Sequence, residues 1–200
     1  MRSQDIVQAV VQALTIEVET SGRHVHLTEE GVERLFGPGH RLTPAKDLSQ
    51  PGQFACVERV DVVGPKGVLK NVAVLGPERK ECQVEVSRTD AVSLGLDPPV
   101  RQSGDLRESC PVLLRAGERT LELARGVIVA QRHVHMTPQD AARFGVGDGE
   151  QVGLRCLTSR PAILLNTVVR VSERFATYVH LDYDEANACG WKKGDRARLV

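Results

Sequence analysis

A six-residue motif that occurs twice constrains the fold more than any other feature of the chain. The string R-H-V-H-L-T begins at Arg23, and R-H-V-H-M-T begins at Arg132, 109 residues later. A Phe-Gly pair follows each copy at a similar distance, at Phe36 and at Phe144. Since 200 residues are enough for two domains of about 100 residues each, the repeat predicts a duplicated small domain.

Short segments rich in Val, Ile and Leu make up most of the chain after residue 15. Turn signals such as Gly-Pro-Lys-Gly at 64–67 separate them. Many short strands with few helical patterns favour barrels, so we predict a mainly β fold of two small β-barrels capped by short α-helices. The expected strands are Thr15–Glu19, Cys56–Val63, Val68–Leu75, Cys82–Arg88, Val112–Leu114, Thr120–Leu123, Val127–Ala130, Gln151–Leu157, Ala162–Val171, Thr177–Leu181 and Arg196–Val200.

The predicted helices are short. One is Glu29–Phe36, and three more begin where Ala follows an acidic residue, at Asp90, Asp140 and Glu185, and end at a glycine. A further helix is predicted over residues 1–14, which carry an apolar stripe at helical spacing. This N-terminal helix either packs on its own protein or docks on a partner or shell. The stripe consists of Ile6, Val7, Val10, Val11 and Leu14.

Composition argues against several classes of protein. The chain has 26 basic and 26 acidic residues and is 41% hydrophobic, which disfavours both a disordered chain and a nucleic-acid-binding protein. Its five cysteines form no C-x-x-C pair, so we expect reduced thiols. No apolar run is long enough for a membrane span, and we expect no secretory signal.

Two H-x-H pairs, one in each copy of the motif, are the candidate chemical centre. Alternate residues of a strand share a face, so His24 and His26 point one way, as do His133 and His135. Two imidazoles on one face can bind one metal ion, whereas four buried imidazoles without partners would be costly. The alternative is that both pairs are surface residues kept from a duplication. His40 lies in a glycine-rich loop and is expected to be no ligand.

Strand parity adds two candidate ligands, Glu85 and His180, which face away from the apolar residues of their own strands. If the apolar faces fill the barrels, the ligands lie outside, where the two barrels meet. Five imidazoles and one carboxylate would hold two metal ions with open positions, as in catalytic zinc sites, although Co²⁺, Ni²⁺ or Fe²⁺ also fit. On spacing alone, both residues could equally be solvent-exposed.

Arg79 is a candidate anion-binding residue, because it lies in the loop just before the strand of Glu85. Its guanidinium group matches a phosphate or carboxylate in a bidentate fashion. Without that neighbour it would be interpreted as a solvated loop arginine.

Six blocks, in order from about residue 17 to the C-terminus, carry a family resemblance. They are S-G-R-H-V-H-L-T, D-L-S-Q-P-G-Q-F-A, V-L-G-P-E-R-K-E-C-Q-V-E-V-S-R-T-D-A, P-P-V-R-Q-S-G-D-L, G-V-I-V-A-Q-R-H-V-H-M-T and H-L-D-Y-D-E-A-N-A-C-G. On these blocks the chain resembles the phosphate propanoyltransferase (phosphotransacylase) family of bacterial microcompartments. The resemblance implies that propanoyl-CoA, or a similar short acyl-CoA, and phosphate are converted to acyl phosphate and CoA at a di-zinc site.

The resemblance also implies a swapped arrangement, in which the N-terminal strand joins the C-terminal barrel. The expected parts are a helix over 1–14, one barrel from 15–22 plus 131–200, and a second barrel from 23–130. The N-terminal helix weakly resembles an encapsulation peptide. We therefore expect the protein in the microcompartment lumen or the cytoplasm. The expected partners are shell proteins or cargo enzymes, and a homo-oligomer is possible. Neither nucleic acid nor membrane is expected as a partner.

Site residues carry over by position. The resemblance implies that Arg79 contacts phosphate and that CoA contacts Ser21, Lys46, Leu75, His180 and Asn187. At Ala73 the family often has an arginine, which puts one CoA phosphate contact in doubt. The implied zinc ligands are His24, His26, Glu85, His133, His135 and His180.

Three other functions stay open on the residues alone. A di-metal hydrolase would use the same ligands without phosphate as acceptor, a zinc-stabilised shell module would have filled coordination spheres, and a mononuclear metal oxygenase would need only one triad. No Ser-His-Asp or Cys-His arrangement is evident, so we favour direct attack by phosphate over a covalent acyl-enzyme.

Overall fold

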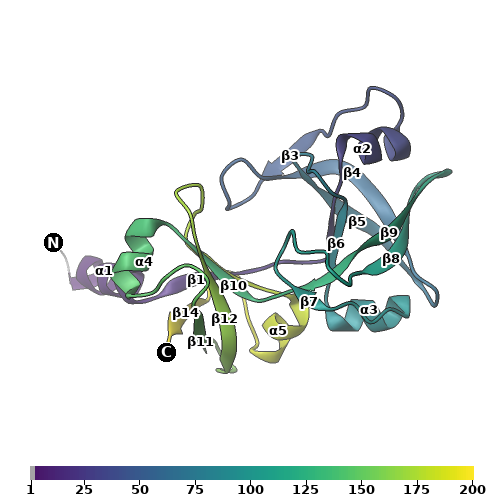
Figure 1. The fold of residues 1–200 in the computed structure, drawn as a ribbon. Coiled ribbons are helices and arrows are strands. Elements are labelled where there is room, and N and C mark those ends of the chain that lie inside the picture. The colour runs from purple at the N-terminus through teal and green to yellow at the C-terminus, as the bar shows by residue number, and fades with distance from the viewer. Residues whose placement is uncertain (1–2) are drawn as a thin grey trace. The chain divides into compact units, whose positions relative to one another are not determined.

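The computed structural model describes residues 3–200, and contacts divide the chain into two compact units (Figure 1). Unit 1 combines the N-terminal segment up to Ser21 with Arg132–Val200, and unit 2 consists of Gly22–Gln131. Each copy of the repeated motif therefore lies in a different unit.

Unit 1 contains a closed six-stranded barrel in the order β1-β13-β10-β12-β11-β14. Its first strand, β1, runs parallel to β13 and antiparallel to β14, so the N-terminal strand completes a barrel of C-terminal strands, as predicted. The strands are β1 (Ile16–Thr20), β10 (His133–Met136), β11 (Gln151–Leu157), β12 (Ile163–Val171), β13 (Tyr178–Leu181) and β14 (Arg196–Leu199).

Unit 2 contains an eight-stranded sheet in which six strands pair in a closed ring, β4-β5-β2-β6-β9-β8. The remaining two strands, β3 and β7, pair at its margins. The prediction of a mainly β fold with two small barrels is confirmed. The strands are β2 (His24–His26), β3 (Pro44–Asp47), β4 (Phe54–Val63), β5 (Val68–Gly76), β6 (Gln83–Val86), β7 (Val100–Arg101), β8 (Cys110–Ala116) and β9 (Arg119–Ala130).

Four short helices follow the strands that carry the candidate ligands. The threonine that ends each copy of the motif is an N-cap: Thr28 accepts a hydrogen bond from the Gly31 amide, and Thr137 accepts one from the Asp140 amide. The motif thus encodes a strand and the start of a helix together. The helices are α2 (Glu29–Phe36), α3 (Arg88–Leu94), α4 (Pro138–Phe144) and α5 (Tyr183–Ala188).

Several element boundaries differ from those predicted, and the strands β3 and β7 were not expected. The strand expected over Cys82–Arg88 ends at Val86, because the Ser87 hydroxyl caps α3. The two strands expected on either side of Ala124–Gly126 form one strand, β9. The last helix ends with Cys189 rather than Gly190 as its C-cap.

The interior of each barrel is apolar, and the residues between the paired histidines belong to it. Val25 and Val134 have no exposed surface, and each packs in the core of its own unit. On the third-ligand strands, Val84 and Val179 are equally buried. Because side chains alternate along a strand, the candidate ligands project from the opposite face, as predicted.

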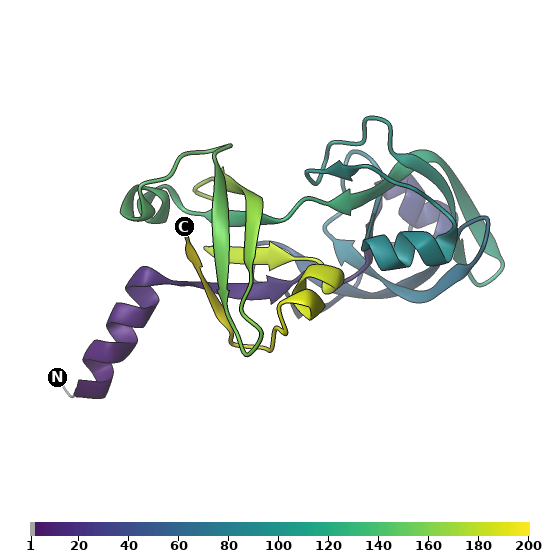
Figure 2. The ribbon, with the colours of Figure 1, turned by 90° about the horizontal axis from the view of Figure 1, so that it is seen from below.

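Helix α1 (Ser3–Leu14) projects from the barrel of unit 1 (Figure 2). Residues 1 and 2 of the helix predicted over 1–14 lie outside the described residues. Its apolar side chains are exposed, with Val7 at 62% and Leu14 at 58%. Among the described residues, we find no helix with both the length and the apolarity needed to cross a membrane.

Candidate metal centres

The first candidate centre lies in unit 2 and joins β2 to β6. His24 and Glu85 are directly opposite in the antiparallel register of these strands, and His26 lies two residues further along β2. All three side chains therefore share one face of the sheet. All three are buried, with 2–7% of their surfaces exposed.

The donor atoms of this triad have the spacing that one zinc ion requires. Nε2 of His24 lies 3.2 Å from Nε2 of His26 and 3.6 Å from Oε2 of Glu85. Two ligands bound tetrahedrally at zinc–nitrogen distances of 2.0–2.1 Å are about 3.3 Å apart. These two separations are thus close to those around a tetrahedral ion, and all three donor atoms lie within 4.8 Å of one another.

Backbone carbonyls aim both imidazoles of this triad. Nδ1 of His24 lies 2.8 Å from the Gly22 carbonyl oxygen, and Nδ1 of His26 lies 3.3 Å from that of Leu75. Because a carbonyl oxygen only accepts, both Nδ1 atoms donate, and Nε2 of each neutral ring carries the lone pair. Two lone pairs then point at the same place, an arrangement that a cation stabilises.

The titration of the triad reflects its burial and its single carboxylate. Burial lowers the pKa of His24, but the Glu85 carboxylate and the Gly22 carbonyl together more than offset this, so that the pKa is raised overall. Burial and the neighbouring His24 hold the pKa of His26 well below its ordinary value. Burial would raise the pKa of Glu85, yet His24 lowers it strongly, so the carboxylate is ionised at neutral pH.

The second candidate centre lies in unit 1 and consists of three histidines. His133 and His180 are opposite each other on β10 and β13, and His135 follows on the same face of β10. Nδ1 of His135 lies 3.1 Å from Nε2 of His180, and the three ring centroids are 4.6–4.9 Å apart. Phe175 stacks on His135 with ring centroids 4.1 Å apart.

Each triad meets the requirements of a three-ligand metal site. The potential ligand atoms of each group lie within 4.8 Å of one another. Nitrogen-rich donor sets of this kind suit Zn²⁺, and three protein ligands leave a fourth position open. The structure thus brings the six sequence-predicted ligands together as two groups of three, one in each unit.

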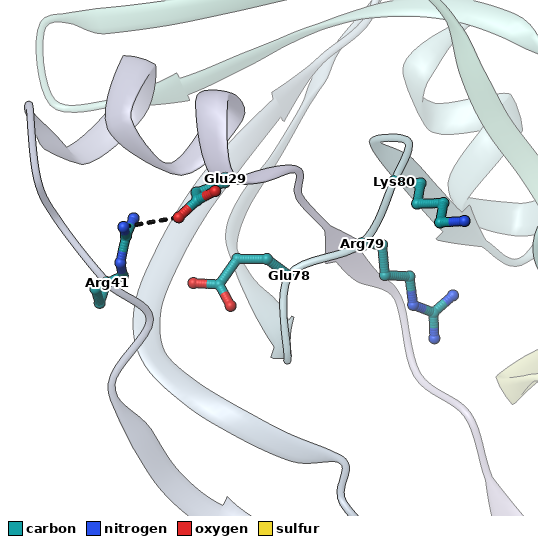
Figure 3. A pocket seen from close by; sticks show the side chains of 5 residues that line it. All are labelled: Glu29, Arg41, Glu78, Arg79 and Lys80. Atoms are coloured by element: carbon teal, nitrogen blue, oxygen red, sulfur yellow. Dashed lines mark ion pairs between the residues drawn. The ribbon is translucent and has the colours of Figure 1, made fainter.

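Arg79 lies beside the triad of unit 2. Its Nη1 donates to Oγ of Ser103 over 3.1 Å, and its charge lowers the pKa of His24 and His26. Arg79 also borders a hollow of about 680 Å³ (Figure 3). There the carboxylate of Glu78 points toward the Glu29–Arg41 ion pair, while the Arg79 side chain extends the other way. The hollow is lined by Glu29, Arg41, Glu78, Arg79 and Lys80.

The residues expected to contact CoA are distributed over both units. Ser21 and Asn187 belong to unit 1, where the Ser21 amide donates to the Leu181 carbonyl and Asn187 is exposed on α5. Lys46 and Leu75 belong to unit 2, on β3 and β5. Each is thus placed within its own unit.

Two further positions bear on these expectations. Ala73, the departure from the family pattern, lies beside His24 in the parallel register of β5 and β2. His40 is hydrogen-bonded to Glu58 over 2.8 Å, and neither of the two triads includes it.

Sequence reasoning missed two polar residues of unit 2, Gln83 and Ser103. Gln83 donates to Glu85, and Ser103 accepts from both Gln83 and Arg79. Alternation along the strand predicted that Gln83 lies on the same face as Glu85, but it indicated no function for Gln83. Ser103 comes from a loop 18 residues beyond Glu85, and no spacing rule links the two positions.

Comparison with known proteins gives a consistent result. A family model described as phosphate propanoyltransferase matches residues 17–192. The chain is 51% identical over 197 residues to the phosphate propanoyltransferase of Clostridioides difficile, covering 98% of this chain and 94% of that protein. For the proteins of the same name from Listeria monocytogenes and Thermotoga maritima, the identities are 50% over 197 and 46% over 198 residues. They cover 98% of this chain in both cases, and 92% and 94% of the relatives. The similarity extends over both units.

Proposed function

Since the chain belongs to the phosphate propanoyltransferase family and is therefore an acyltransferase, we propose that it transfers a short acyl group, propanoyl or similar, between CoA and inorganic phosphate. A phosphate oxygen attacks the thioester carbonyl carbon, a carbon–oxygen bond forms, and the carbon–sulfur bond breaks. The products are acyl phosphate and CoA thiolate, which takes up a proton. The observation that carries the proposal is the pair of three-ligand clusters, one of them beside Arg79.

The proposed enzyme holds two zinc ions. His24, His26 and Glu85 bind one, and His133, His135 and His180 bind the other. Bound zinc supplies a Lewis acid that polarises the carbonyl oxygen and stabilises negative charge developing there. The support is the spacing of the donor atoms, of which three pairs lie 3.1–3.6 Å apart and all lie within 4.8 Å in each triad, and the orientation of the unit 2 imidazoles. This orientation comes from the carbonyls of Gly22 and Leu75.

Arg79 binds and orients inorganic phosphate in this proposal. Its guanidinium group donates to Ser103 through Nη1, and a guanidinium group matches an oxyanion such as phosphate in a bidentate fashion. A held phosphate attacks with a smaller entropic cost than a free one, and the positive charge offsets part of the repulsion between phosphate and Glu85. In this proposal CoA contacts Ser21, His180 and Asn187 of unit 1 and Lys46 and Leu75 of unit 2, the positions that the family resemblance implies.

The N-terminal helix bears on the proposed location and partners of the protein. The apolar stripe of α1 is exposed, which supports docking on a shell or a cargo enzyme rather than packing on its own barrel. We therefore place the protein in a microcompartment lumen or in the cytoplasm. Its assembly into a homo-oligomer stays a prediction.

The direct test supplies the purified, zinc-loaded chain with acetyl-, propanoyl- and butanoyl-CoA, with and without inorganic phosphate. We expect CoA release that depends on phosphate and acyl phosphate that is trapped by hydroxylamine, together with two zinc ions per chain by elemental analysis. Release of free acid at the same rate without phosphate would instead identify a hydrolase and overturn the proposal. No turnover with any of the three would also overturn it.

A further inference from the structure

The two triads are built on the same local frame. Glu85 pairs with His24 across β6 and β2, and His180 pairs with His133 across β13 and β10. In both units the strand of the third ligand leads into a short helix that begins with a capping box. Glu85 and His180 therefore occupy equivalent positions, so the two triads can be compared residue by residue.

The frames differ at a second position, two residues before the third ligand. Unit 2 has Gln83 there, opposite His26, and unit 1 has Tyr178, opposite His135. A neutral imidazole ligand offers a metal one nitrogen, whereas a carboxylate offers two similar oxygens and rotates readily about its last bond. Only the triad that contains a carboxylate needs a neighbouring residue that leaves one of the two oxygens to bind the metal.

Gln83 has the contacts for that task. It is 2% exposed, and its Nε2 donates to Oε1 of Glu85 over 2.6 Å and to Oγ of Ser103 over 2.9 Å. Its Oε1 accepts from the Gly104 amide over 2.7 Å. A flipped amide would set oxygen against the carboxylate and N–H against N–H, so these contacts fix its orientation.

We propose that Gln83 is a positioning residue, which makes Glu85 a metal ligand through Oε2 alone and ties it to Arg79 through Ser103. The amide occupies Oε1 of Glu85, and Oε2 faces His24. Glu85 is thereby held as a monodentate ligand. The inference rests on the proposed function, because it assigns Gln83 a task within that metal site.

The link to Arg79 runs through one hydroxyl group. Oγ of Ser103 accepts from Nε2 of Gln83 and from Nη1 of Arg79. The arginine proposed to hold phosphate and the carboxylate proposed to hold zinc are thus linked through Ser103 and Gln83. A displacement of Gln83 is expected to disturb both the metal and the phosphate.

The test measures metal binding at unit 2 alone. In a His135→Ala background, which removes the unit 1 site, Co²⁺ is titrated and its visible d–d absorption recorded. We expect Gln83→Met, which has similar volume but no donor, to weaken Co²⁺ binding about 10–100-fold and to alter the band shape. In the His135-intact enzyme, the apparent phosphate KM should rise more than the KM for acyl-CoA.

Tyr178→Phe, made in chains with an intact His135, is the matched control, because Tyr178 holds the equivalent position in unit 1 and pairs with His135. It should leave the cobalt affinities and the phosphate KM unchanged. Gln83→Glu is the second variant: it keeps an acceptor for Gly104 but sets a second carboxylate against Glu85, and we expect the same or a larger loss.

The outcomes separate the two proposals. If the wild-type chain binds no cobalt at this triad or makes no acyl phosphate, the proposed function fails. If it does both, and a folded Gln83→Met or Gln83→Glu chain keeps wild-type affinity and phosphate KM, only the role of Gln83 is overturned. Failure of both variants to fold, even with metal present, would make Gln83 a residue of the fold and would also overturn its positioning role.

Discussion

Removal of metal should destabilise the protein by an amount that can be assigned to each triad. The potential ligand atoms of each triad already lie within 4.8 Å of one another, so we expect zinc to bind with little ordering of new structure and to stabilise the folded chain by mass action. At free zinc 100 times above the dissociation constant, each site contributes about 2.7 kcal/mol. For a cooperative transition of about 200 residues, this raises the melting temperature by about 5–11 °C per site.

The assay compares melting curves with zinc and with a strong chelator. Because the triads lie in separate compact units, we expect His26→Ala and His135→Ala each to remove one part of the zinc-induced shift, and the double variant to remove all of it. His40→Ala is the matched control, since His40 pairs with Glu58 outside both triads and should keep the full shift. A wild-type shift that survives in the double variant would refute the assignment of both sites.

Three further predictions follow from single side chains. Arg79→Ala should lower kcat/KM about 100-fold and raise the phosphate KM while two zinc ions stay bound, and unchanged phosphate kinetics would remove Arg79 from its role. Burial would raise the pKa of Glu58, but hydrogen bonds from His40 and a backbone amide lower it overall. Its stabilising contribution is therefore complete above the ordinary carboxyl pKa of about 4.3 and lost below it. Melting temperatures should fall less steeply below pH 4.3 in Glu58→Gln than in wild type, and equal slopes would contradict this. Gly64→Ala should cost about 2 kcal/mol or more in urea unfolding, because its Cβ would lie 2.3 Å from the Leu94 carbonyl oxygen, and a neutral effect would contradict the close approach.

The architecture was predictable from the sequence because its strongest signals are periodic. The alternation of valine with histidine in each copy of the motif indicated which face is buried, and the structure bears this out for Val25 and Val134. Local chemistry also placed α2 at Glu29–Phe36. The error at the end of β6 arose because Ser87 and Arg88 extend a strand-like segment, whereas the Ser87 side chain caps a helix.

The candidate site was less predictable, because its parts come from distant segments. Parity placed Glu85 and His180 on the correct faces, but spacing alone did not distinguish a ligand from a solvent-exposed residue. The family resemblance named them as ligands, and the register of β2 with β6 and of β10 with β13 then brought each opposite a histidine. Ser103 lies outside any strand, so no periodic pattern predicts its contacts.

The pairing of β1 with β13 and β14 has a consequence for biosynthesis. The ribosome releases Ile16–Thr20 long before its partners, and both of its backbone edges stay unpaired until the last residues emerge. Gly22–Gln131, by contrast, contains all strands of its own sheet and can fold while translation continues. Translation of the final seventy residues therefore limits when the N-terminal strand is protected from aggregation, and a nascent chain stalled before β13 would carry an exposed, pairing-competent edge.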